Sequence, residues 1–301
     1  MIDLKPLGVR AGHATDPEGG TGCTVFIFDK PVRASASVRG AAPASRETDL
    51  LNPGKLIREI HGIVLTGGSA FGLESAYGVM RYLEERGIGY DTGTAVVPIV
   101  PAAGIYDLKY RSDVRPDKEW GYRAASSADY RLESGIVGAA TGATVGKFLG
   151  IERASKTRLG ISRVEFDGYR LVSVMVVNAL GEIVDEKGNI VAGVRTEKGF
   201  IPSMDLIDRL DFEKVRRGEN TTIGVVITDF PLNKEMLNRL AEISHNGIAR
   251  AIRPSHTPFD GDIIFAVSTS EVSGEENPYR LLKLFALTEL TVQKAILDSV
   301  V

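Results

Sequence analysis

Six short runs of apolar residues, each bounded by turn residues, constrain the fold of this chain more than any other feature. Most of the runs are continuous rather than alternating, so the predicted strands should be covered on both faces. They lie at residues 24–28, 62–65, 96–100, 171–177, 222–227 and 263–267. The sequence therefore predicts a sheet, or a pair of sheets, buried inside the protein.

Segments with helical periodicity separate these runs, at residues 69–86, 138–148, 233–252 and 278–297. In the third segment the apolar side chains fall on one stripe, which predicts a helix packed against a sheet. Strands and helices in this mixture predict an α/β layered fold in which helices sandwich the sheets. Because no repeat or low-complexity linker divides the chain, residues 1–301 are expected to form a single domain.

Composition excludes several classes of protein. The net charge is only -3, and the 36 basic and 39 acidic residues are scattered, so nothing indicates a nucleic-acid partner. No stretch approaches the roughly 18 apolar residues of a membrane span, and the first residues lack a signal-peptide pattern. We expect a soluble, cytoplasmic protein with no membrane partner, in which the single cysteine, Cys23, is a small buried residue.

Two polar segments are predicted to be loops. Residues 105–130 include the only tryptophan, Trp120, and show weak periodicity, which is typical of a long loop over a rigid scaffold. Residues 186–219 are charged and end immediately before the apolar run that starts at Thr221. The junction at Asn220 is therefore expected to be an exposed loop that enters a buried strand.

Residues 65–80 and 134–147 are rich in glycine and other small residues. Such segments can present backbone N–H groups to an anion at a helix N-terminus, but they also allow helices to pack closely. The nucleotide-binding loop motif is absent, because Phe148 stands where it needs Ser or Thr. We favour close packing over anion binding, and on pattern alone Lys147 is interpreted as a surface residue.

Thr221 and Thr222 open the fifth apolar run. On pattern alone they are β-branched residues that suit a strand. Their surroundings, GENTTIGVVITDFPL, closely resemble the processing site of the β-aminopeptidase and L-aminopeptidase/D-esterase family, which includes the nylon-oligomer endohydrolase. The resemblance continues in order through GHATDPEGGTGCTV, LTGGSAFGLESAYGVMRYLEERG, VGAATGATVGK, VVNALGEIVD and HTPFDGDIIFAVST.

The resemblance implies an α-β-β-α sandwich similar to that of the N-terminal nucleophile hydrolases. It implies one self-cleavage at Asn220–Thr221, giving fragments 1–220 and 221–301, with Thr221 as the new N-terminal nucleophile. An α-amine has a pKa near about 8, so it suits the role of base for its own hydroxyl. The expected substrate is a small amide or peptide, no cofactor or metal ion is required, and the processed units are expected to form a homo-oligomer.

The family's remaining site residues carry over motif by motif. Asp260 and Asp262 take the positions that orient the nucleophile, and residues two apart entering a strand point to the same face. Without the family, an Asp-Gly turn before the strand explains them equally well. The aminopeptidase branch is expected to have Ser-Gly-Glu here, so DGD is similar to the nylon-oligomer branch.

Three further residues match family positions. Lys147 matches an active-site lysine, whose charge would favour the neutral form of the new amine. Asn178 matches the side-chain amide that stabilises the oxyanion, although an ordinary strand-end Asn remains the alternative. Tyr106 matches a tyrosine of the substrate pocket, where its hydroxyl would assist the oxyanion or the leaving amine.

Two competing functions stay open at this point. His256, Asp260 and Asp262 lie within seven residues and, supplemented by His13 and Asp16, are candidates for a metal-dependent hydrolase site. No paired H-E-x-x-H spacing supports that hypothesis. The other alternative is a non-catalytic binding protein of the same fold, which would leave the chain uncut.

Overall fold

A computed structural model of the chain describes residues 1–108, 110–208, 219–272, 274 and 277–301. Its centre is a mixed sheet in the order β12-β13-β18-β20-β3-β5-β8-β4, with β2 also paired to β3. The pairs β18–β20 and β5–β8 are parallel, and the others are antiparallel. These strands are β2 (Val9–Asp16), β3 (Thr21–Val38), β4 (Ala44–Arg46), β5 (Glu59–Thr66), β8 (Ala102–Gly104), β12 (Gly160–Phe166), β13 (Tyr169–Asn178), β18 (Thr221–Thr228) and β20 (Ile263–Ser268).

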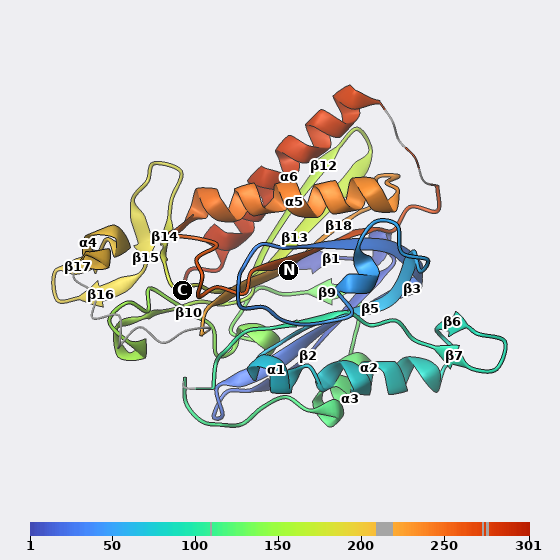
Figure 1. The fold of residues 1–301 in the computed structure, drawn as a ribbon, viewed down its shortest axis with the longest axis horizontal. Helices are drawn as coiled ribbons and strands as arrows, with labels where there is room; N and C mark the ends of the chain where they lie inside the picture. Colours follow the sequence, from blue (N-terminus) through green and yellow to red (C-terminus); the bar gives the residue numbers. More distant parts are fainter. Residues whose placement is uncertain (109, 209–218, 273, 275–276) are drawn as a thin grey trace.

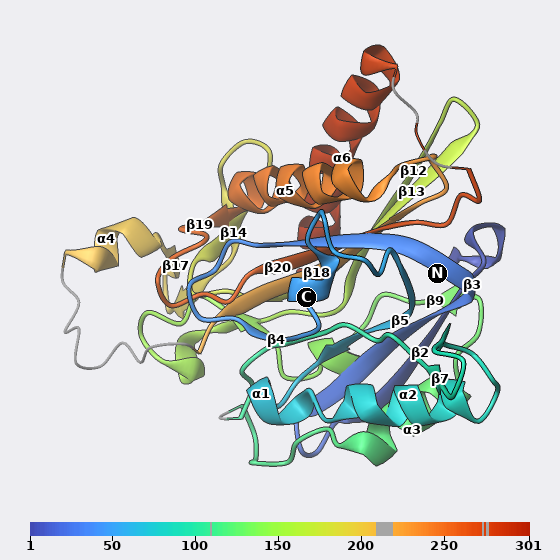
Figure 2. The same cartoon turned by 45° about the vertical axis from the view of Figure 1, so that its right-hand side comes forward.

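The long strand β3 joins two layers of this sheet. Its first half pairs with β2 and β5, whereas its second half pairs with β20, and the register on β5 shifts between Ile27 and Val32. Figures 1 and 2 show the two layers facing each other, with helices α5 (Lys234–Ala251) and α6 (Pro278–Asp298) over one outer face. Helices α2 (Ser75–Glu84) and α3 (Lys118–Ser126) cover the other outer face, which gives four layers in the order α-β-β-α.

Three apolar clusters separate the four layers. The central core lies between the two sheet layers, and the others lie between a sheet layer and its helices. Along β18, Ile223, Val225 and Ile227 face the central core, while Val226 faces the core under α5 and α6. Because successive side chains of a strand point to opposite faces, a continuous apolar run is what this doubly covered strand requires.

The helical predictions have mixed outcomes. The predictions for 233–252 and 278–297 are confirmed by α5 and α6, whose N-caps are the side chains of Asn233 and Asn277. The segment 69–86 divides into α1 (Ser69–Gly72) and α2. The prediction of a helix at 138–148 is wrong. This segment holds a 3-10 turn (Gly138–Ala140) and β10 (Thr144–Val145), and Gly146 has a left-handed φ of 74°.

Two other expectations also need correction. The predicted loop 105–130 contains α3, which the side chain of Asp117 caps by accepting hydrogen bonds from the N–H groups of Glu119 and Trp120. The predicted strand 96–100 is reduced to β7 (Val96–Val97), since Pro98 follows and has no N–H to donate. The five remaining strand predictions are confirmed, because these apolar runs lie in chain order within β3, β5, β13, β18 and β20.

Shorter elements complete the fold. They are β1 (Ile2–Asp3), β6 (Tyr90–Asp91), β9 (Arg131–Leu132), β11 (Ser155–Lys156), β14 (Glu182–Val184), β15 (Ile190–Ala192), β16 (Val194–Thr196), β17 (Gly199–Ile201), β19 (Ile252–Arg253), α4 (Ser203–Ile207) and 3-10 turns at Lys5–Leu7, Asp49–Leu51 and Ile151–Arg153. Cys23 is fully buried, and burial raises the pKa of its thiol to about 12. None of the helices described has the length and apolar character needed to cross a membrane.

Candidate active site

The candidate site is built around the first residue of β18, Thr221. Across the sheet Thr221 pairs with Asn178, the last residue of β13, and Asn220 forms a parallel bridge with Asp260. Asn220 is 2% exposed and Thr221 is 3% exposed. The prediction of an exposed junction is therefore wrong at this bond, because the sheet pairing continues back to Asn220.

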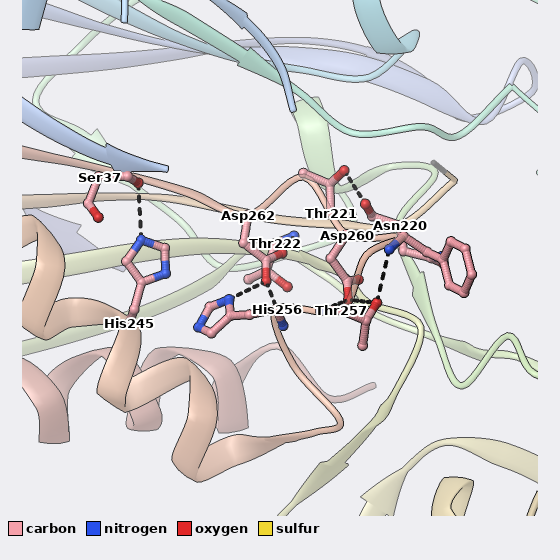
Figure 3. A network of polar contacts seen from close by, with 10 residues as sticks. Ser37, Asn220, Thr221, Thr222, His245, His256, Thr257, Asp260 and Asp262 are labelled. Carbon is pink, nitrogen blue, oxygen red and sulfur yellow. Dashed lines mark hydrogen bonds and ion pairs between the residues drawn. The ribbon is translucent and has the colours of Figure 1, made fainter. Parts of the chain in front are cut away.

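The carbonyl group of Asn220 receives two hydrogen bonds. The Thr221 hydroxyl donates to the Asn220 carbonyl oxygen at 2.5 Å (Figure 3). The Gly261 N–H donates to the same oxygen at 2.9 Å. Donors that point at a carbonyl oxygen stabilise the negative charge that develops there during attack. The geometry therefore places a hydroxyl beside a polarised peptide carbonyl.

Asp262 lies directly before β20 and has partners on both carboxylate oxygens. Oδ1 accepts from the Thr222 N–H at 2.6 Å, which fixes the start of β18. Oδ2 lies 2.7 Å from Nδ1 of His256 and 3.3 Å from the His256 backbone nitrogen. The side chain is 2% exposed, so these partners compensate for lost hydration.

Asp260 is also buried but is held differently. Its Oδ2 accepts from the N–H and the hydroxyl of Thr257, at 2.9 and 2.5 Å. Its Oδ1 has no hydrogen-bond partner among the described residues. Burial raises the pKa of this carboxyl, the charge of Asp262 raises it further, and the Thr257 hydrogen bonds and Lys147 oppose the shift. The raised pKa makes the Asp260 carboxyl easier to protonate than an ordinary aspartate.

Lys147 and Asn178 lie on the other side of the junction. Lys147 Nζ donates to the carbonyl and to Oδ1 of Asn178, both at 2.8 Å, and to the Glu219 carbonyl at 3.2 Å. Asn178 Nδ2 donates to the same Glu219 carbonyl at 3.3 Å. Lys147 is thus not the surface residue that its local pattern indicated, and burial lowers the pKa of its ammonium to about 7.

Tyr106 reaches this region through its backbone. Its carbonyl oxygen accepts from Asn178 Nδ2 at 3.0 Å. The role predicted for its hydroxyl stays a prediction. Five candidate side chains, those of Thr221, Asp260, Asp262, Lys147 and Asn178, are therefore gathered around the Glu219–Thr221 segment.

Asp107 is a buried residue that the motif comparison did not single out. Its carboxylate accepts from the Gly68 N–H at 2.7 Å and from the Thr21 hydroxyl at 2.8 Å. Burial raises its pKa to about 6, against the opposing charge of Lys147. In the sequence, its position next to Tyr106 is what indicates that Asp107 belongs to the site.

The two glycine-rich segments meet at this carboxylate. A Cβ added at Gly67 would lie 2.2 Å from Asp107 Oδ2, and one added at Gly142 would lie 2.6 Å from the same atom. At Gly67 and Gly142, which lie outside the helices, the missing side chain makes room for Asp107; the favoured close packing of helices holds at Gly78 of α2, where an added Cβ would lie 1.8 Å from the Lys118 carbonyl oxygen of α3. The carboxylate of the chain itself takes the Gly68 N–H that an external anion would need.

The residues of the metal hypothesis make other contacts. His256 binds Asp262, His13 Nδ1 lies 3.0 Å from the Thr24 hydroxyl, and Asp16 accepts from the Gly19 N–H at 2.8 Å. Within the described ranges, no group of three or more His, Cys, Asp or Glu side chains is arranged to hold a metal ion.

Comparisons of the sequence relate this chain to known proteins. The model of peptidase family S58 matches residues 3–301. An uncharacterized aminopeptidase of Mycobacterium tuberculosis is 38% identical over 286 residues, covering 88% of this chain and 80% of its own. A 6-aminohexanoate-oligomer endohydrolase of a Kocuria species is 34% identical over 280 residues, covering 90% of this chain and 76% of its own.

Solved structures share the fold. The L-aminopeptidase D-Ala-esterase/amidase of Ochrobactrum anthropi, described as a variant of the Ntn hydrolase fold, superimposes with a TM-score of 0.71 at 18% identity. A β-aminopeptidase from a Burkholderia species gives 0.72 at 17% identity. Each comparison covers 97% of this chain and 83% of the other, and both confirm the predicted α-β-β-α sandwich.

Proposed function

The chain belongs to peptidase family S58, and from this membership we propose an amide hydrolase that activates itself by cutting its own Asn220–Thr221 bond. One observation carries the proposal. The Thr221 hydroxyl lies 2.5 Å from the Asn220 carbonyl oxygen, and the Gly261 N–H holds that oxygen from another side. The hydroxyl and the carbonyl group that are proposed to react are thus joined by a hydrogen bond within one chain.

The proposed cut has two steps. In the first, the Thr221 oxygen forms a bond with the Asn220 carbonyl carbon, the peptide C–N bond breaks, and the hydroxyl proton moves to the leaving nitrogen. In the second, water opens the resulting ester, which leaves a carboxylate on Asn220 and restores the Thr221 hydroxyl. Asp260 forms a parallel bridge with Asn220, and its carboxylate is the proposed carrier of this proton, which it takes from the oxygen and passes to the nitrogen.

The uncut chain blocks its own oxyanion donors. Lys147 Nζ and Asn178 Nδ2 both donate to the carbonyl oxygen of Glu219, at 3.2 and 3.3 Å. A substrate carbonyl would need those same donors. Once the bond is cut, the segment that ends at Asn220 is free to leave, and we propose that the two donors then serve the substrate.

The proposed enzyme uses the α-amine of Thr221 as the base for its own hydroxyl, since such an amine has a pKa near about 8. Asp262 and Asp260 orient the new terminus, and Lys147 and Asn178 stabilise the oxyanion. Both functions named for the relatives, aminopeptidase and 6-aminohexanoate-oligomer endohydrolase, act on amide bonds. We propose small amides, peptides or amino-acid oligomers as the substrate class.

The cut is tested by intact-mass measurement of the purified protein. Wild type should give two masses, those of residues 1–220 and 221–301, whereas Thr221→Ala should stay whole because it has no nucleophile. Thr288→Ala is the matched control, since Thr288 is a buried threonine of α6 whose hydroxyl donates within its own helix, to the Leu284 carbonyl at 2.8 Å. A wild-type chain that stays whole while hydrolysing amides would disprove the mechanism.

The activity is tested on the processed protein with a panel of amino-acid amides, β-peptides and amide oligomers. Hydrolysis should require the cut, and its rate should be unchanged when a chelator is added. Chelator-sensitive hydrolysis by Thr221→Ala would instead support a metal-dependent enzyme. A whole wild-type chain without activity on any panel member would support a binding protein.

A further inference from the structure

His256 occupies a position that the proposed chemistry leaves unexplained. Its Nδ1 lies 2.7 Å from Oδ2 of Asp262, whose other oxygen holds the Thr222 N–H at 2.6 Å. A carboxylate only accepts hydrogen bonds, so in this contact the ring nitrogen is the donor. One carboxylate therefore links the His256 ring to the residue that follows the nucleophile.

The His256 ring is held in place by a second histidine. Figure 3 shows the two rings side by side, and their centroids lie 4.9 Å apart with the planes at 67°. The ring of His245, on α5, is fixed in turn by the carbonyl of Ser37, 3.0 Å from its Nε2. Burial, together with the neighbouring His256, lowers the pKa of His245 to about 4, so this supporting ring is neutral.

The backbone of His256 is also unusual. Its φ is 55°, a left-handed value that favours glycine and is uncommon for other residues. Such a conformation persists only where surrounding contacts enforce it. Here the backbone N–H of His256 also points to Oδ2 of Asp262, at 3.3 Å, so the same turn brings two donors to one oxygen.

The neighbouring carboxylate has no comparable support. Asp260 is held by Thr257 on one oxygen, and its other oxygen has no partner among the described residues. Two buried carboxylates in one site repel each other, and hydrogen-bond donors compensate for the hydration that a buried carboxylate loses. His256 supplies a ring donor to Asp262, and Asp260 receives none of that kind.

We propose that His256 is a positioning residue that fixes Asp262 as the acceptor for the Thr222 N–H and so sets the Thr221 hydroxyl against the Asn220 carbonyl. The inference rests on the self-cleavage proposed above. His256 does not touch the reacting atoms; it acts through Asp262. Its loss should slow the cut without preventing the chain from folding.

The test compares His256→Gly with His256→Asn. Glycine removes the ring and suits the positive φ. Asparagine also tolerates that φ, and its Nδ2 can replace Nδ1 as a donor to Asp262. His61→Asn is the matched control. His61 lies on β5 and is 3% exposed, and its Nδ1 accepts the Ile99 N–H at 3.1 Å.

Self-cleavage is followed by intact mass after the chain is made and purified rapidly, and thermal unfolding of each variant is measured in parallel. We expect His256→Gly to cut at least tenfold more slowly, His256→Asn to stay within about threefold of wild type, and His61→Asn to match it. Added imidazole should speed the cut in His256→Gly, because the His256 side chain is 22% exposed and its site is accessible.

The outcomes separate this inference from the proposed function. A wild-type chain that stays whole disproves the self-cleavage itself. If wild type cuts and His256→Gly cuts as fast, only the role of His256 is wrong. The role is also wrong if both His256 variants slow the cut equally, without response to imidazole and in proportion to their loss of thermal stability. If His256→Gly fails to fold, a folded His256→Ala, whose small side chain has no donor, takes its place: normal cutting would overturn the inference, and slow cutting that added imidazole speeds up would support it.

Discussion

Asp260 and Asp262 are identical side chains two positions apart, yet their surroundings give them different chemistry. Asp262 accepts hydrogen bonds on both oxygens, from Thr222 and His256. Asp260 keeps one oxygen without a partner among the described residues, and its pKa is raised. A carboxylate with hydrogen bonds on both oxygens is suited to hold neighbouring groups in position. A carboxylate with one unpartnered oxygen and a raised pKa is suited to exchange a proton.

Lys147 has a pKa of about 7 in the folded chain against an ordinary value of 10.5, so its burial links stability to pH. Between these two values the unfolded chain binds more protons than the folded one, and stability therefore rises with pH. From pH 7 to pH 9 this single group should add about 2 kcal/mol to the free energy of unfolding.

The prediction is measured by urea unfolding at pH 7 and pH 9, in a Thr221→Ala background that keeps the chain whole. Adding Lys147→Met should remove about 2 kcal/mol from the rise, since methionine does not titrate. Part of the rise should remain, because burial also lowers the pKa of Lys156 to about 7. Exposed Lys198 supplies the control, and an equal change of slope in Lys198→Met would contradict the assignment.

At the residue scale the sequence predicted the site residues only through the family motifs. Thr221, Asp260 and Asp262 each have an ordinary local explanation, and pattern alone placed Lys147 on the surface. The hydrogen bonds that hold Lys147 in the site join it to Asn178 and to Glu219, 72 positions further along the chain. Contacts across such separations leave no periodic signal, and the same holds for the partnership of His256 with His245.

At the element scale, glycine decides where segments can approach one another. A Cβ at Gly142 would lie 2.3 Å from the Gly20 carbonyl oxygen and 2.5 Å from Asp107 Cβ, distances that real Cβ atoms do not adopt. Gly142→Ala should therefore force the segment around Gly142 away from Gly20 and Asp107. We expect it to destabilise the protein by at least about 2 kcal/mol, as overpacking in a rigid interior does.

Gly135→Ala is the matched control within the same segment. Among the residues that the structure describes, a Cβ at Gly135 would meet only Val137, at an ordinary 3.7 Å. Its effect on the free energy of unfolding should stay within about 0.5 kcal/mol. Equal midpoints of urea unfolding for the two variants would contradict the packing explanation.

The elements that the sequence predicted best are those with the strongest periodicity. Helices α5 and α6 carry a clear apolar stripe and a capping Asn, and both lie where they were expected. Residues 138–148 were predicted helical because small residues also occur in packed helices. Positive φ at Gly138 and Gly146 and the close approach to Asp107 are tertiary requirements, which a period of 3.6 residues cannot reveal.

For the whole molecule, the α-β-β-α sandwich and the family were both predicted correctly from the sequence. Continuous apolar runs predicted strands buried on both faces, and β13, β18 and β20 are buried in this way. The ordered motif blocks predicted the family, which the match over residues 3–301 confirms. The strand order was not predicted, because β3 joins both layers through a register shift that depends on its partners.

The strand order determines what the proposed cut does to the molecule. Residues 221–301 contribute β18 and β20, and these adjacent strands lie between β13 and β3 of the larger fragment. Their inward side chains, Ile223, Val225 and Ile227 from β18 and Ile263, Phe265 and Val267 from β20, belong to the central core. Each such side chain stabilises the association by roughly 1.5–3 kcal/mol when buried.

The two fragments should therefore remain one folded unit after the cut. Size-exclusion chromatography in buffer should give one peak that contains both masses, at the same elution volume as uncut Thr221→Ala. The fragments should separate only when the column is run in a denaturing concentration of urea, because separation exposes the central core and breaks the β13–β18 and β20–β3 pairings. A small fragment that elutes alone in buffer would show that these pairings do not hold the halves together.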